Sequence, residues 1–154
     1  MGLRERISAD TKEAMKAKET ARLSTLRLIS AAIKDREIAA RGEGGDENGL
    51  SDADLTAILS KMVKQRQESA KAYEEGGRLE LAEREQDEIK VIQSYLPRQL
   101  TDEEARAAID KVITDLGAAS IRDMGRVMAE LRARHAGQMD FGAVGPIIKD
   151  RLMA

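Results

Sequence analysis

The stretch EIKVIQSYLPRQLTDEEARAAI (residues 88–109) contains the first of only two prolines in the chain, between two segments that both have helical spacing. Proline disfavours the α conformation of the residue before it, so a helix should end at Leu96. Shortly after Pro97, Thr101 and Glu104 have the spacing of a capping box, which begins a new helix. We therefore predict that the chain has a domain boundary at this proline.

The boundary divides the chain into a front domain, residues 1–96, and a tail domain, residues 97–154. The segment from Pro97 to Leu100 can span only roughly 13 Å, at about 3.3 Å per residue. We expect a short connection between the two domains instead of a long tether.

Composition favours an all-α fold. Apolar residues make up 42% of the 154 residues but aromatic residues only 2%, so the core must consist of Leu, Ile, Val, Met and Ala. Such a core favours helices over sheets. Charged residues reach 35% with a net charge of −2, which is typical of amphipathic helices with solvated faces.

Apolar spacing and local end signals predict about four helices in the front domain and three in the tail. Ser51 with Asp54, and Ser120 with Asp123, have the spacing of helix starts. The glycine-rich, acidic stretch ARGEGGDENGLSD (residues 40–52) predicts a flexible connection. In the last helix, Pro146 should either produce a kink or postpone the start.

Charged residues fall on two apolar helix faces of the front domain. At 100° per residue, Arg66 lies at the centre of one face, and Glu85 and Glu88 lie on the other. A turn at Gly76 would bring Arg66 level with Glu85 in an antiparallel hairpin. We predict a partly buried ion pair between Arg66 and Glu85, with Glu88 beside it, since an isolated buried charge is too costly. Acid/base chemistry by the two glutamates is the alternative.

The residue inventory excludes several kinds of site. The chain has no Cys and a single His, which excludes a thiolate nucleophile, a disulfide and a cluster of His ligands. We therefore expect no metal, no cofactor and no catalytic residue. No apolar run has the length of a signal peptide or a membrane span, so we expect a cytoplasmic protein with no membrane partner.

One segment of the tail is basic. In IRDMGRVMAELRARHAG (residues 121–137), only two acids accompany the arginines, which are Arg122, Arg126, Arg132 and Arg134. Such an edge can contact phosphates. An ordinary solvated helix face explains the same pattern, and no aromatic residue is placed to stack on bases.

Two stretches resemble the GatB/YqeY family. RLELAEREQDEIKVIQSYLP (residues 78–97) matches its run of spaced residues ending in Y-L-P, and RDMGRVMAEL (residues 122–131) matches its D-M-G-x-V-M segment. Weaker likeness in residues 26–37 and 50–69 extends the resemblance over nearly the whole chain. The motif residues are Tyr95, Leu96, Pro97, Asp123, Met124 and Gly125. The chain departs from the family at LRARHAGQMD, where a proline and a basic residue are usual, and at Gly145-Pro146.

The resemblance implies a free-standing YqeY-like protein, whose tail is similar to the C-terminal domain of the GatB subunit of tRNA-dependent amidotransferase. In that enzyme the tail helps hold tRNA while the chemistry occurs elsewhere. The likeness makes tRNA, and proteins that modify or aminoacylate tRNA, the expected partners. From charge alone we add Arg122 and Arg126 as candidate tRNA contacts.

Three functions remain open from the sequence. The first is an accessory protein that binds tRNA or associates with a tRNA amidotransferase. The second is a part in carbon-nitrogen ligase activity with glutamine as amido-N-donor, although the chain lacks Cys and a nucleotide-binding loop. The third is a helical protein-interaction module. We expect the first.

Overall fold

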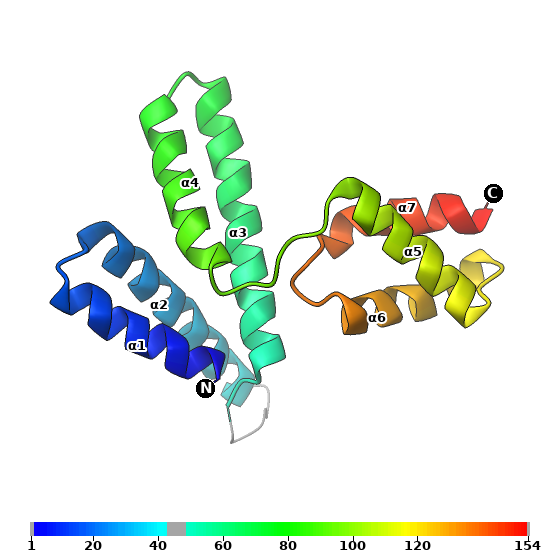
Figure 1. Ribbon diagram of the computed structural model, residues 1–154, viewed down its shortest axis with the longest axis horizontal. Coiled ribbons are helices and arrows are strands. Elements are labelled where there is room, and N and C mark those ends of the chain that lie inside the picture. Colours follow the sequence, from blue (N-terminus) through cyan, green and yellow to red (C-terminus); the bar gives the residue numbers. More distant parts are fainter. Residues whose placement is uncertain (1, 43–48, 154) are drawn as a thin grey trace. The chain divides into compact units, whose positions relative to one another are not determined.

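The structure, a computed structural model, describes residues 2–42 and 49–153. Within these residues all regular structure is helical, which confirms the all-α prediction. The chain divides into two compact units, residues 1–96 and 97–154 (Figure 1). Each unit has its own hydrophobic core. None of the described helices is long and apolar enough to cross a membrane.

The front unit consists of two helical hairpins (Figure 1). The first joins α1 (Leu3–Lys16) to α2 (Thr20–Gly42), and the second joins α3 (Asp52–Glu75) to α4 (Leu79–Gln93). The largest fully buried side chains in their shared core are Leu26, Ile29, Leu55, Leu59 and Ile92. Aliphatic side chains thus supply the main driving force for this unit.

Local chemistry explains the hairpin ends. Lys18 (φ 59°) and Gly77 (φ 74°) turn the chain in the left-handed conformation, after α1 and α3 respectively. Ser51 and Asp54 form a reciprocal capping box at the start of α3, as the sequence predicted. The predicted flexible connection lies mainly in residues 43–48, outside the described residues.

Tyr95 fastens the end of α4 to α1. Its side chain is buried, and its hydroxyl donates a 2.5 Å hydrogen bond to Asp10 Oδ2. The guanidinium of Arg6 lies 5.3 Å from the centre of the ring, within cation–π range. Burial, and then the contact with Asp10, raise the pKa of the Tyr95 hydroxyl well above its usual value. The phenol therefore keeps its proton and donates a hydrogen bond to Asp10.

The tail unit contains α5 (Asp102–Leu116), a 3-10 turn η1 (Ile121–Asp123), α6 (Met124–Arg134) and α7 (Phe141–Met153). Its core is separate from that of the front unit, and its fully buried residues include Ile109, Val112, Val127, Leu131 and Ile148. Gly117, which closes α5, has the left-handed conformation (φ 62°) that favours glycine.

Pro146 does not postpone the last helix, because α7 begins at Phe141. The neighbouring Gly145 is buried, and a Cβ built there would lie 3.8 Å from the terminal methyl groups of both Met124 and Met128. A Cβ at this distance would be in ordinary van der Waals contact, so the methionines of α6 pack close to this part of α7. Proline here lacks the N–H that would bond the carbonyl four residues earlier.

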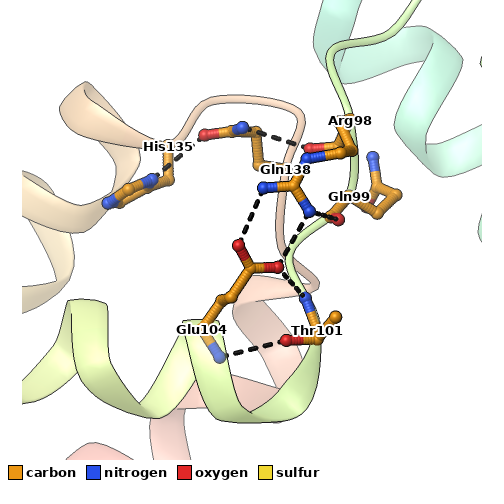
Figure 2. Close-up of polar contacts among 6 residues, drawn as sticks. All are labelled: Arg98, Gln99, Thr101, Glu104, His135 and Gln138. Carbon is orange, nitrogen blue, oxygen red and sulfur yellow. Dashed lines mark hydrogen bonds and ion pairs between the residues drawn. The ribbon is translucent and has the colours of Figure 1, made fainter.

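The segment after Pro97 is tied to the loop between α6 and α7 (Figure 2). Leu100 N–H donates to Gln138 O (3.0 Å), and Gln138 Nε2 donates to the carbonyl of Arg98 (3.1 Å). The Oε1 atom of Gln138 lies 3.0 Å from His135 Nδ1, so the single histidine orients this amide. These bonds make the segment part of the tail unit.

Arg98 and Glu104 add a bidentate ion pair to the capping box of α5 (Figure 2). The two guanidinium–carboxylate distances are 2.8 and 2.7 Å. Glu104 Oε1 also accepts from Thr101 N–H at 3.0 Å, while Thr101 Oγ1 accepts from Glu104 N–H at 3.2 Å. The Arg98 contact, followed by the Thr101 N–H, lowers the pKa of Glu104 to about 2.

Replacing Tyr95 with phenylalanine should lower the free energy of unfolding of the front unit by about 1 to 2 kcal/mol, because it removes a hydrogen bond to a charged group. Urea unfolding of the full chain, followed by circular dichroism, measures this loss. Tyr73→Phe is the matched control, since the half-buried Tyr73 has no hydrogen bond from its hydroxyl within the described residues. Equal losses in both variants would contradict the role of the Asp10 contact.

Glu104→Gln should lower the melting temperature of the tail at pH 7. A carboxylate whose folded pKa lies near 2, below the ordinary 4.5, contributes stability that is present above pH 4.5 and lost as the pH falls through about 2. Circular dichroism melts at pH 7, 4 and 2 should show a difference from the unmodified protein that shrinks towards pH 2. Glu103→Gln, also in the first turn of α5, is the control and should have a smaller effect. A difference that persists unchanged at pH 2 would contradict this account.

Candidate nucleic-acid interface

The basic segment of the tail begins at a capped turn. Ser120 and Asp123 form a capping box around η1, and α6 follows directly. One oxygen of Asp123 accepts from the N–H groups of Ala119 (3.0 Å) and Ser120 (3.3 Å). The Ala119 N–H, followed by the Arg126 guanidinium, lowers the pKa of the Asp123 carboxyl. The carboxylate therefore fixes the start of the segment that carries the arginines.

Arg122 and Arg126 lie on either side of this start. The side chain of Arg126 is 57% exposed, and its Nη2 lies 2.8 Å from Asp123 Oδ1. Arg122 is exposed and forms no ion pair within the part of the chain that the structure describes. The two arginines are four positions apart, so both project from the same side of the helical segment.

Arg134 belongs to an ion-pair network that the sequence did not predict. It contacts Asp115 of α5 and Glu130 of α6, each at 2.8 Å. Asp115, followed by Glu130, raises the pKa of the Arg134 guanidinium, which is charged in any case. Two carboxylates neutralise this arginine, so it connects α5 to α6 and is less available to a partner than the other three.

Arg132 lies over the ring of Phe141, the first residue of α7, at 5.8 Å from the ring centre. It is exposed and forms no ion pair among the described residues. The ring holds the guanidinium without neutralising it. The sequence offered no signal for this contact, because it depends on how the loop after α6 positions the start of α7 against the end of α6.

Gly125 lies between Arg122 and Arg126, in the first turn of α6, and is exposed. A Cβ built on it would meet no atom within 4 Å, so packing within the chain does not require glycine there. The adjacent Met124 has an internal role, since it packs against Gly145. Within the D-M-G-x-V-M motif, Gly125 is therefore the residue whose identity is not explained by packing within the chain.

The charged residues on the apolar faces of the front unit form a different pair from the one expected. Arg66 Nε lies 2.9 Å from Glu88 Oε2, and Arg66 Nη1 donates to Met62 O at 3.2 Å. The two charged side chains are 16% and 23% exposed. Glu85 is half-buried and is not the partner. The relative register of α3 and α4 therefore differs by about one turn from the estimate made by counting residues from the hairpin turn.

Curated relatives share the name "Altered inheritance of mitochondria protein 41, mitochondrial". The protein of Lachancea thermotolerans is 35% identical over 112 residues, which are 71% of this chain and 57% of that protein. That of Eremothecium gossypii is 38% identical over 90 residues, or 58% of this chain and 46% of its own. A Saccharomyces cerevisiae protein is 28% identical over 131 residues, which are 81% of this chain and 68% of that protein. The match thus spans about half the length of the first two relatives.

These names contradict our expectation of a cytoplasmic protein, because each relative is described as mitochondrial. The expectation rested on the absence of a signal-peptide run and of a membrane span. Those absences carry no information about entry into an organelle.

The family comparison covers almost the whole chain. The model described as "Yqey-like protein" matches residues 4–152, which include both units and both motifs. Within the motifs, Tyr95 fastens α4 to α1 and Asp123 caps the basic segment. The chain therefore belongs to the YqeY-like protein family.

Proposed function

We propose that the protein is an accessory factor that binds tRNA through the exposed start of α6. The binding face consists of Arg122, Gly125, Arg126 and Arg132 and is called the α6 face below. It acts as a holding surface, while the chemistry of any tRNA modification belongs to a partner protein.

Gly125 is the observation that carries this proposal. Glycine in a helix costs about 0.5 to 1 kcal/mol relative to alanine, and the free space around Gly125 shows no packing gain that offsets the cost. A residue without a side chain, between two exposed arginines, allows the backbone of a partner to approach α6 closely. The positive end of the helix dipole and the flanking guanidinium groups favour a phosphate there.

The electrostatics of the α6 face permit phosphate binding. Arg122 and Arg132 have no carboxylate partner in the described part of the chain. Arg126 is paired, but an exposed pair of this kind contributes only about 0 to 1 kcal/mol. Asp123 also retains its two backbone N–H donors if Arg126 turns to a phosphate. Exchanging the carboxylate for a phosphate is therefore inexpensive.

The choice of tRNA as the nucleic acid rests on the likeness of the tail to the C-terminal domain of GatB. That likeness also favours association with a tRNA amidotransferase or another protein that acts on tRNA. The chain has no Cys to serve as a glutaminase nucleophile, so a partner must supply any carbon-nitrogen ligase activity that uses such a nucleophile.

Neutralising Arg122 and Arg132 together should weaken tRNA binding and make it less sensitive to salt. Each phosphate contact that is lost should reduce the slope of log affinity against log salt by about 1. Fluorescence anisotropy with labelled tRNA over a series of salt concentrations measures both quantities for R122A/R132A.

The matched control is R106A/K149A, which removes two exposed positive charges from α5 and α7. It should leave the salt slope within error of the unmodified protein. If the two double variants lose the same affinity, binding depends on overall charge and the α6 face is not the site. An unmodified protein with no salt-sensitive tRNA binding would also contradict the proposal.

Gly125→Ala should have opposite effects on folding and on binding. The new methyl group meets no atom, so the free energy of unfolding of the tail should rise by about 0.5 to 1 kcal/mol. The same methyl group should hinder the approach of RNA and lower the affinity for tRNA, and Gly125→Gln should lower it further. Urea unfolding and anisotropy test the two effects. Ala107→Gln, an exposed change on α5, is the steric control. Unchanged affinity in both Gly125 variants would show that close approach at this position is not needed.

A further inference from the structure

A groove of about 600 Å³ lies between α2 and α4 within the front unit. Figure 1 shows the α3–α4 hairpin diverging from the α1–α2 hairpin. The residues that line it are Ala21, Arg22, Ser24, Thr25, Glu80, Glu83, Arg84, Asp87, Glu88 and Val91. None of them belongs to the α6 face.

The α4 side of the groove carries a row of charges without internal partners. Glu80, Glu83, Arg84 and Asp87 have the spacing i, i+3, i+4 and i+7, so they share one helix face. All four are exposed, and none forms a hydrogen bond or ion pair within the described part of the chain. Three carboxylates against one guanidinium leave this face negative.

The other two charged residues of the lining are satisfied within the fold. Glu88 pairs with Arg66, which lies outside the lining, at 2.9 Å. Arg22 lies 3.3 Å from Glu19 and 3.9 Å from Asp10. The charges of Glu88 and Arg22 are therefore already compensated within the fold. The unpaired acidic row on α4 favours an occupant with positive charge.

The α2 side of the groove is less polar. Thr25 is buried and its hydroxyl donates to the Ala21 carbonyl at 3.3 Å, so it presents no unpaired polar atom to the groove. Leu28 follows Ala21 and Thr25 on the same helix face at i+7 and i+3, and it remains 42% exposed. Ala21 and the half-buried Val91 of α4 provide apolar surface within the lining, and Leu28 extends it about one turn beyond the lining along α2.

We propose that this groove binds a basic amphipathic helix of a protein partner. Helix-in-groove recognition combines an apolar anchor with charged flanks, and here Leu28 and Val91 offer the apolar surface and the acidic row offers the complement to Lys or Arg. From Glu80 to Asp87 the row extends roughly 10 Å, at 1.5 Å per residue, which is two turns of a partner helix.

Charge and geometry exclude two other occupants. In the described part of the chain, no three His, Asp or Glu side chains gather closely enough to hold a metal ion. An RNA or another polyanion would be repelled by the acidic row. The inference goes beyond tRNA binding and is independent of it, because it concerns the front unit and a protein partner.

A synthetic stapled helix supplies the probe. It carries arginines at i, i+4 and i+7 on one side of a leucine stripe, and a second stapled peptide has the same composition with the arginines distributed around the helix. Fluorescence anisotropy with the full chain should show salt-sensitive binding of the first peptide and at least about tenfold weaker binding of the second. Amide chemical shifts should change most at Thr25, Leu28 and Val91.

Two variants test the site. Glu83→Lys combined with Asp87→Lys should weaken binding of the first peptide about tenfold or more, because it places like charges opposite each other. Leu28→Gln should weaken it without a change in charge. Glu74→Lys combined with Glu75→Lys, which reverses two exposed acids at the end of α3, is the matched control and should leave the affinity nearly unchanged.

Three results would overturn the proposal. Equal binding of the two peptides would show that no helix face is recognised. Equal losses in the groove variant and in the α3 control would show that only net charge matters. Chemical-shift changes confined to residues outside the groove would place the peptide elsewhere. The R122A/R132A variant should bind the peptide normally, so failure of this inference and failure of tRNA binding are distinguishable.

Discussion

Proline cannot donate a backbone hydrogen bond and disfavours the α conformation of the residue before it, and the boundary between the two helical units lies at Pro97. The chain on each side is fixed by its own contacts. Tyr95 holds the end of α4 through Asp10, and Gln138 holds the backbone of Arg98 and Leu100 within the tail. Each of these sets of contacts lies within one unit, and each unit has its own hydrophobic core.

The sequence predicted the features that depend on local chemistry. The capping boxes at Ser51, Thr101 and Ser120 form as expected, because each requires only two side chains and the backbone between them. The left-handed glycine at 117 ends α5 for an equally local reason. The all-α class followed from a composition in which aliphatic residues are plentiful and aromatic residues are scarce.

Features that depend on tertiary register could not be predicted. Arg66 pairs with Glu88 because packing of α3 on α4, and not residue counting from the turn, determines which side chains are level. The tail shows the same limit: Arg134 meets Asp115 of α5, and Arg132 meets Phe141 of α7. The sequence showed that four arginines lie in one basic segment. It did not show which of them form ion pairs within the fold. The space around Gly125 is likewise a property of the folded tail alone.

The nearly neutral net charge conceals surfaces of opposite character. The α4 face of the front unit carries three carboxylates without ion-pair partners among the described residues, whereas the α6 face of the tail keeps Arg122 and Arg132 free of carboxylates. Surface charges of this kind contribute little to folding. They have a large influence on which molecules approach and in what orientation. The two proposed binding sites therefore share no residue and differ in the charge of the partner that each would favour.

The distribution of aromatic residues has a practical consequence for spectroscopy. The chain has no Trp, and its two tyrosines, Tyr73 and Tyr95, both belong to the front unit, while the ring of the tail is Phe141. Absorbance near 280 nm and intrinsic emission consequently report on the front unit alone. An unfolding curve recorded by either signal would follow the unfolding of the front unit only. Unfolding of the tail would not change the signal, so a separate transition of the tail would go undetected.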